Sequence, residues 1–252
     1  QGSISVFGAY LTTELFYRND VNFFLSIVMG VIVGFITGII IDTLIIRKAK
    51  NVTSVGKQMI TMGLVLVFAG IIPLIFGAVP VTVDRLRTFA PGSISWSMFG
   101  ETFSITRHAL ISISISVVVI AGIFAALKFT KWGLGVRATA SSELVSGMMG
   151  INTRIITALS WAIAGGIGSM AAIMYFHIPR TIGVSAMIPY QINAFMASIL
   201  GGFSTFFGPI VGAVLIPATS TVVGYQYSVW KNVIVYVLIL IVILIRPYGL
   251  FG

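Results

Sequence analysis

The 252-residue sequence contains no cysteine, two histidines, and only 8% Asp, Glu, Lys and Arg. A soluble domain normally carries about 25% of these charged residues. The lack of cysteine excludes disulfides, thiol nucleophiles and cysteine-based metal sites. No GxxxxGK[ST] phosphate-binding loop is present, and His108 and His177 fall at the predicted ends of apolar stretches, where a Ser/His/Asp triad is not credible. We therefore expect neither an enzyme nor a bound cofactor.

What the sequence does have is apolar surface: 58% of its residues are hydrophobic and its mean hydropathy is +1.07. A water-soluble fold of this size could not bury so much apolar side chain, so the surrounding solvent is lipid. The net charge of +9 comes from basic residues in short gaps between apolar runs. We interpret them as cytoplasmic anchors rather than a nucleic-acid surface, since no basic stripe with interleaved aromatics occurs.

Crossing the hydrocarbon core takes about 20 apolar residues in a helix. The serine–isoleucine alternation near residue 113 resembles a strand, but lipid tolerates no open sheet edge, so we predict a helix there as well. The first apolar stretch, residues 3–16, is short, and we expect it to be the end of a truncated span. Further spans are predicted over residues 21–46, 55–79, 109–127, 155–176 and 233–245.

Two regions interrupt this pattern. Residues 80–108 form a polar segment, the only loop large enough for a short interfacial helix. Residues 188–224 contain several glycines and prolines. They are either two full spans or a re-entrant pair entering from the outer side. The prediction is an all-α, polytopic integral membrane helix bundle of about seven or eight segments, some broken or re-entrant, forming one domain over residues 1–252.

Basic residues concentrate on the side of the membrane that holds residues 47–57, residues 128–154 and the C-terminal Arg246. This bias places that side, and the C-terminus, in the cytoplasm. Asp42 lies near the cytoplasmic end of its span, within about a turn of Arg47, where we expect it to be paired or to reach the interface. Glu14 lies near the end of its own stretch. Neither is at mid-membrane, which argues against a proton-driven device.

Gly30, Gly34 and Gly38 form a GxxxGxxxG pattern on one face of the 21–46 span. Small residues at this spacing allow another helix to approach closely. We expect these glycines to pack within the bundle, with a seam between two subunits as the alternative.

The stretch GLGVRATASSELVSGMMGIN follows the 109–127 span. Residues 138–149 have apolar positions at helical spacing and predict a short amphipathic helix, and Gly150 suits its end. On physical grounds alone, such a helix is either a plain interfacial helix or a docking element for a motor protein.

This stretch, extended through TRIITALSWAIAGGIGSMAA, resembles the cytoplasmic signature of the branched-chain amino acid permeases of ABC importers. ASILGGFSTFFGPIVGAVL and RPYGLFG resemble further blocks of the same family. QGSISVFGAY resembles a block that lies well inside family chains, so we expect a missing N-terminus. Leu144, Val145 and Ser146 depart from the family pattern.

The resemblance implies a coupling segment at about residues 133–152 that meets the ATPase. The residues expected there are Gly133, Arg137, Ala138, Glu143, Gly150 and Asn152. A candidate translocation path follows from the interrupted apolar segments, although Asn193 fits a helix-to-helix hydrogen bond equally well. The residues expected along that path are Asn193, Ser198, Gly201, Gly202 and Ser204.

The implied function is that of a permease subunit of an ATP-driven ABC importer for branched-chain or related amino acids, in the inner (plasma) membrane. Its implied partners are ABC ATPase subunits, a second like or unlike permease subunit, and a periplasmic or extracellular solute-binding protein. The alternatives are an ABC permease for another small solute such as a sugar, an amide or urea, or an ion-coupled carrier or channel.

Overall fold

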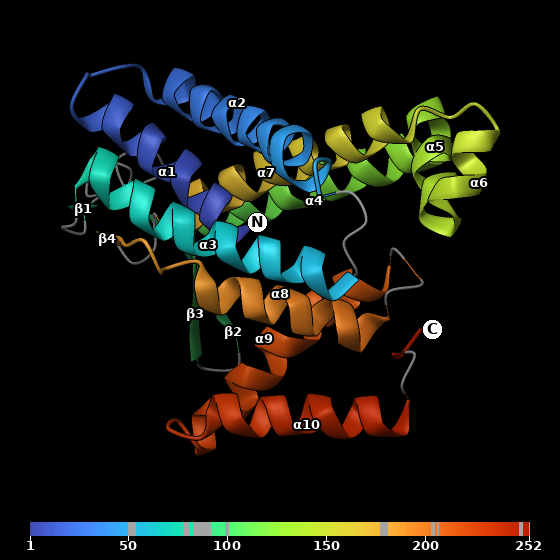
Figure 1. The fold of residues 1–252 in the computed structure, drawn as a ribbon. Helices are drawn as coiled ribbons and strands as arrows, with labels where there is room; N and C mark the ends of the chain where they lie inside the picture. The colour runs from blue at the N-terminus through green and yellow to red at the C-terminus, as the bar shows by residue number, and fades with distance from the viewer. Residues whose placement is uncertain are drawn as a thin grey trace. The chain divides into compact units, whose positions relative to one another are not determined.

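The structure, a computed structural model, describes residues 1–49, 54–77, 81–82, 92–98, 101–176, 181–202, 205, 207–246 and 249–251. These residues form ten α-helices, one π-helix and four short strands, which confirms the all-α class (Figure 1). The chain divides into two compact units. The first comprises Gln1 and Ser3–Ala186, and the second comprises Met187–Gly252 together with Gly2. Each unit is described by itself.

Five helices are long and apolar enough to cross a membrane. The spans are Phe23–Ile46, Gln58–Phe76, Arg107–Phe129, Thr153–Phe176 and Gly208–Gln226. They fall on α2 (Phe23–Ile41) with the π-helix Asp42–Ile46, α3 (Ser54–Phe76), α4 (Arg107–Phe129), α7 (Thr153–Phe176) and α9 (Gly208–Gln226). Three shorter helices are α1 (Gly2–Tyr17), α8 (Ile188–Gly201) and α10 (Lys231–Ile245). The chain is thus a multi-pass membrane protein, as the hydropathy pattern predicted.

The closest packing in the first unit joins α2 to α7, whose ribbons run together in Figure 1. A Cβ added to Gly34 would lie 2.7 Å from the Gly165 carbonyl oxygen, and one on Gly38 would lie 2.9 Å from Ala162 Cα. Gly30 faces α1 instead, where an added Cβ would lie 2.7 Å from the Gly8 carbonyl oxygen. The GxxxGxxxG face therefore lies against helices of its own chain, at distances that only glycine permits.

Hydroxyl groups complete the packing between α1 and α2. Thr12 Oγ1 donates to the carbonyl oxygens of Gly8 and Ser26, at 3.0 and 3.2 Å. An aromatic cluster lies on the other side of α1, where Phe7 contacts Phe68 and Phe76 of α3 edge to face. In lipid, close packing and interhelical hydrogen bonds replace the hydrophobic effect as the main force between helices.

The polar segment after α3 contains a β-hairpin where an interfacial helix had been considered. β2 (Ser93–Met98) pairs antiparallel with β3 (Glu101–Thr106), from Ser93 opposite Thr106 to Met98 opposite Glu101. This segment is large enough for a short interfacial helix, but these residues form strands, because serine alternates with apolar residues in SISWSM with the period of a strand. A second, two-residue pairing joins β1 (Val81–Thr82) to β4 (Thr181–Ile182).

The single amphipathic helix predicted over residues 138–149 is in fact two helices, α5 (Lys131–Ser141) and α6 (Glu143–Met148). The chain is extended at Ser142, with φ −160° and ψ 111°, and the Ser142 hydroxyl oxygen accepts a hydrogen bond from the Val145 amide at 3.3 Å. A serine that caps a new helix in this way ends the preceding one.

The second unit contains α8, α9 and α10. Its core consists of Ala197, Leu200, Ile216, Val235 and Ile239. The chain reverses between α8 and α9 at Gly202, which has φ +93°, a conformation that side chains rarely adopt. An added Cβ on Gly212 would lie 2.9 Å from Ala197 Cα, so α8 and α9 pack closely along the whole contact. Near the C-terminus, the Leu250 amide donates to the Leu200 carbonyl at 2.9 Å.

Candidate functional site

The predicted coupling segment folds as two short helices inserted between the spans α4 and α7. In Figure 1, α5 and α6 form a compact pair beside one end of α4 and α7. Arg137 on α5 and Glu143, the first residue of α6, are both exposed. Neither forms an ion pair within the described part of the chain. Among the described residues, their charges thus have no oppositely charged partner.

Apolar side chains surround these charges. Met148 is 77% exposed, and four further residues are more than half exposed: Leu134, Leu144, Val145 and Met149. Three of them lie within the six-residue helix α6. A helix of six residues is far too short to span the membrane and is marginal in isolation. An exposed apolar patch marks a contact with another protein or with the membrane surface, and the flanking charges fit either.

Glycines and caps fix the corners of this segment. Gly133, in the first turn of α5, lies so close to α4 that an added Cβ would lie 2.5 Å from Leu127 Cα, and its amide donates to Thr130 Oγ1 at 3.1 Å. Ala138 is half-buried in α5. Gly150 takes φ +84° at the exit from α6, and Asn152 Oδ1 then accepts from the Ile155 amide at 3.4 Å to cap α7. The predicted coupling residues thus lie in one continuous helix–turn–helix element.

This element contacts the bundle through α7. A Cβ on Gly135 would lie 2.7 Å from Ile156 Cδ1, so α5 rests directly on the first turn of α7. The same end of α7 is held by α2: Arg47 Nη2 donates to the Arg154 carbonyl oxygen at 2.8 Å and to Asp42 Oδ2 at 3.0 Å. Asp42 is only 2% exposed. The expected pairing of Asp42 with Arg47 is confirmed, and the pair also reaches the span that follows the coupling segment.

The residues predicted along a translocation path are not brought together. Asn193 lies near the start of α8, whereas Ser198, Gly201 and Gly202 lie toward its end. Eight residues of helix separate Asn193 from Gly201, a rise of about 12 Å. Ser198 donates to its own helix at Ala194, and Gly201 is packed against Gly208. Ser204 lies outside the described residues.

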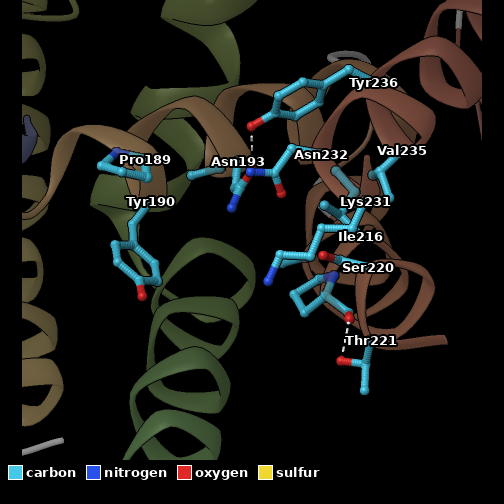
Figure 2. A pocket seen from close by; sticks show the side chains of 13 residues that line it. Pro189, Tyr190, Asn193, Ile216, Ser220, Thr221, Lys231, Asn232, Val235 and Tyr236 are labelled. Atoms are coloured by element: carbon cyan, nitrogen blue, oxygen red, sulfur yellow. Dashed lines mark hydrogen bonds between the residues drawn. The ribbon is translucent and has the colours of Figure 1, made fainter. Parts of the chain in front are cut away.

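Asn193 does face a cavity of about 500 Å³ within the second unit. The Tyr236 hydroxyl of α10 donates to Asn193 Oδ1 at 3.1 Å, which is the helix-to-helix hydrogen bond considered from the sequence (Figure 2). The Asn193 amide nitrogen, which makes no contact in this bond, supplies two further donors. The other polar residues at the cavity are Tyr190, Ser220, Thr221, Lys231 and Asn232.

Sequence reasoning missed Lys231 and Tyr236 as cavity residues. Lys231 was visible only as one more basic residue in a loop between spans. A signal was nevertheless present, because residues 187–252 contain no Asp or Glu and only one other cation, Arg246. Within the described ranges, no cluster of His, Cys, Asp or Glu could hold a metal ion.

Comparisons with known proteins agree with this architecture. Residues 1–244 match the family described as "Branched-chain amino acid transport system / permease component". The probable branched-chain amino acid transport permease protein LivH of Methanocaldococcus jannaschii is 25% identical over 272 aligned residues, covering 100% of this chain and 82% of the relative.

Two bacterial relatives align over shorter regions. The high-affinity branched-chain amino acid transport system permease protein BraD of Pseudomonas aeruginosa is 28% identical, over 66% of this chain and 55% of BraD. The corresponding LivH of Escherichia coli is 24% identical, over 50% of this chain and 41% of LivH. The alignment thus spans about half the length of these two relatives. No solved structure matches the chain significantly.

These relatives are transport permeases rather than enzymes. The match extends over nearly the whole chain, from α1 to the last turn of α10. The chain is a membrane permease and belongs to the family of branched-chain amino acid transport system permease components.

Proposed function

We propose that the chain is the transmembrane permease subunit of an ATP-driven ABC importer in the cytoplasmic membrane, with branched-chain or related amino acids as substrates. The names of the relatives support this substrate class. The observation that carries the proposal is the α5–α6 element, a short exposed helical pair between two spans. Several of its apolar side chains are exposed instead of being packed against the spanning helices. Its charges have no ionic partner among the described residues. A separate ATPase would supply the energy.

The proposed role of α5–α6 is to transmit motion from the ATPase to the spans. α5 is joined to α4 through the tight Gly133 corner, and it rests on α7 at Gly135. α7 is in turn packed on α2 and bridged to it by Arg47. A push on α5–α6 would therefore act on α2, α4 and α7 together, and the resulting tilt would open the pathway alternately to the two sides.

The proposal includes three partners and one orientation. ATPase subunits would bind the α5–α6 face, so this face would lie in the cytoplasm, and the basic-residue bias supports a cytoplasmic C-terminus as well. A second permease subunit, like or unlike this one, would complete the pathway. A solute-binding protein would deliver substrate from the opposite side. The whole of residues 1–252 would act as one permease domain, with residues 133–152 as its coupling segment.

An ion-coupled carrier is less well supported by the described residues. Such a carrier needs an ionisable group within a span that can change its charge. Asp42 is the buried carboxylate of the spanning helices, and it is already held by Arg47 at 3.0 Å.

Charge reversal tests the coupling assignment. Arg137→Glu combined with Glu143→Arg should weaken copurification with the proposed ATPase subunits by at least about tenfold and should lower ATP-dependent transport in parallel. Arg107→Glu is the matched control, because Arg107 is an exposed cation at the opposite end of α4. Unchanged ATPase binding and unchanged transport in the double variant would contradict the assignment.

A further inference from the structure

The cavity in the second unit combines a basic side chain with neutral hydrogen-bond donors. It lies among α8, α9 and α10, and its volume of about 500 Å³ is typical of small-molecule pockets. Figure 2 shows the Lys231 side chain extending into this space from the start of α10. Asn193 and Asn232 add amide groups, and Ser220 adds a hydroxyl. The remaining lining is largely apolar, as at Ile216 and Val235.

No acidic residue of this unit balances the Lys231 ammonium. Residues 187–252 contain no Asp or Glu at all. Lys231 is also the first residue of α10, where the partial positive charge of the helix end disfavours a cation. A cavity with one cation, several neutral donors and no carboxylate is complementary to an oxyanion. A zwitterionic amino acid fits it poorly, because its ammonium group would meet Lys231 and no negative charge.

The residues beside Lys231 indicate which oxyanion the cavity would meet. Lys231 follows the turn between α9, a full-length span, and the apolar helix α10. This turn carries three exposed aromatic residues, Tyr225, Tyr227 and Trp230, of which Tyr225 is 93% exposed. Tyrosine and tryptophan gather where the hydrocarbon core meets the headgroups. The cavity mouth at Lys231 is therefore at headgroup level, where phospholipid phosphates are the most abundant anions.

We propose that this cavity is a binding site for an anionic phospholipid. The phosphate would lie against the Lys231 ammonium and accept hydrogen bonds from the Asn193, Asn232 and Ser220 donors. The glycerol and the first carbons of an acyl chain would lie along the apolar wall that includes Ile216 and Val235. The site belongs to the second unit alone and does not depend on the proposed coupling to an ATPase.

Lipid retention by the intact purified protein tests the site. The protein is transferred from vesicles of phosphatidylglycerol and phosphatidylcholine into mild detergent. Native mass spectrometry then counts the phosphatidylglycerol molecules that remain bound to it. Lys231→Gln should lower the retained phosphatidylglycerol by about fivefold, the factor that one basic residue near a membrane surface provides. Lys231→Arg should retain it. Arg246→Gln, which removes the other cation of the unit, should leave retention unchanged.

Two further measurements separate the sources of the oxyanion. Ala213→Trp would fill the cavity while keeping Lys231, since Ala213 lines the wall. This variant should also lose the lipid. Its unfolding temperature should stay within a few degrees of that of the wild type. Inorganic phosphate at 10-fold excess over the lipid should not displace phosphatidylglycerol. Full retention in Lys231→Gln would overturn the site, and displacement by inorganic phosphate would show an oxyanion site that does not select lipid.

Discussion

Arg47 forms an ion pair with Asp42, at 3.0 Å, across the π-helical end of α2. The Asp42 carboxylate is almost fully buried, whereas the Arg47 side chain is partly exposed. The same guanidinium nitrogen bonds the Arg154 carbonyl in the first turn of α7. The pair thus neutralises a buried charge. In the proposed mechanism it makes α2 move together with α7, the span that follows the coupling segment.

The first prediction concerns this pair. Asp42→Asn should lower the free energy of unfolding by about 2 kcal/mol, because it leaves Arg47 without its buried counter-charge. Breaking a pair with both charges buried costs about 3–5 kcal/mol, and the cost is smaller here because Arg47 is partly exposed. It should also reduce transport more than ATP hydrolysis, since the link between α2 and α7 loosens. Thermal unfolding in detergent and reconstituted transport measure the two effects.

Glu14→Gln is the control for this prediction. Glu14 pairs with Arg18 one turn away, but Arg18 is 71% exposed. Exposed pairs of this kind contribute about 0–1 kcal/mol. Equal losses of stability in Asp42→Asn and Glu14→Gln would show that the buried pair has no special role.

The second prediction concerns the contact between α2 and α7. Gly34→Ala should destabilise the protein by about 1–3 kcal/mol, because its Cβ would collide with Ser169 and the Gly165 carbonyl and force the helices apart. Gly122→Ala on α4 has nothing within 4 Å of its added Cβ. It should therefore leave the unfolding temperature unchanged or raise it slightly, since alanine favours helix. An equal effect of both substitutions would contradict the packing described here.

The third prediction concerns the apolar face of α6. Leu144→Ser with Met148→Ser should weaken binding of the ATPase by at least about tenfold, because burial of each side chain contributes about 1.5–3 kcal/mol. The fold should survive, since both residues are exposed in the isolated chain. Val229→Ser alters a side chain that is 88% exposed in the α9–α10 turn and should leave ATPase binding intact. Copurification of the ATPase and the unfolding temperature are the readouts.

The fourth prediction concerns the cavity wall. Tyr236→Phe removes the hydrogen bond to Asn193 and should lower the free energy of unfolding by about 1 kcal/mol. Tyr227→Phe alters an exposed tyrosine of the interfacial turn and should have no measurable effect on thermal unfolding. A Tyr236→Phe protein as stable as the wild type would show that the bond adds nothing to the contact between α8 and α10.

The spanning helices were predictable from the sequence because their signal is a long apolar run. The expected span over residues 21–46 coincides with the helix Phe23–Ile46 within two residues. The span over residues 155–176 coincides equally well with α7. In lipid, backbone hydrogen bonding allows few alternatives to a helix, so the serine–isoleucine alternation in α4 did not mislead.

The polar regions were predicted less well because competing local signals decide them. The alternation at Ser93–Met98 pairs with a second strand, and no lipid suppresses the hairpin there. Ser142 divides an apparently continuous amphipathic pattern by capping α6. Both signals are present in the sequence, but the first region was predicted only as a polar loop and the second as one continuous helix.

Long-range contacts could not be predicted from the sequence. The pairing of Asp42 with Arg47 follows from local spacing, but the Arg47 bond to Arg154 joins residues 107 positions apart. The meeting of Asn193, Lys231 and Tyr236 at one cavity likewise depends on how α8 and α10 pack. A single sequence contains no direct information on such contacts.

Reconstituted transport tests the central claim most directly. The permease is placed in liposomes with and without the ATPase subunits and the solute-binding protein, and uptake of radiolabelled leucine is followed with ATP supplied on the ATPase side. We expect accumulation above the external concentration only when the ATPase and ATP are present. Sustained accumulation by the permease alone, driven by a proton or sodium gradient, would contradict it.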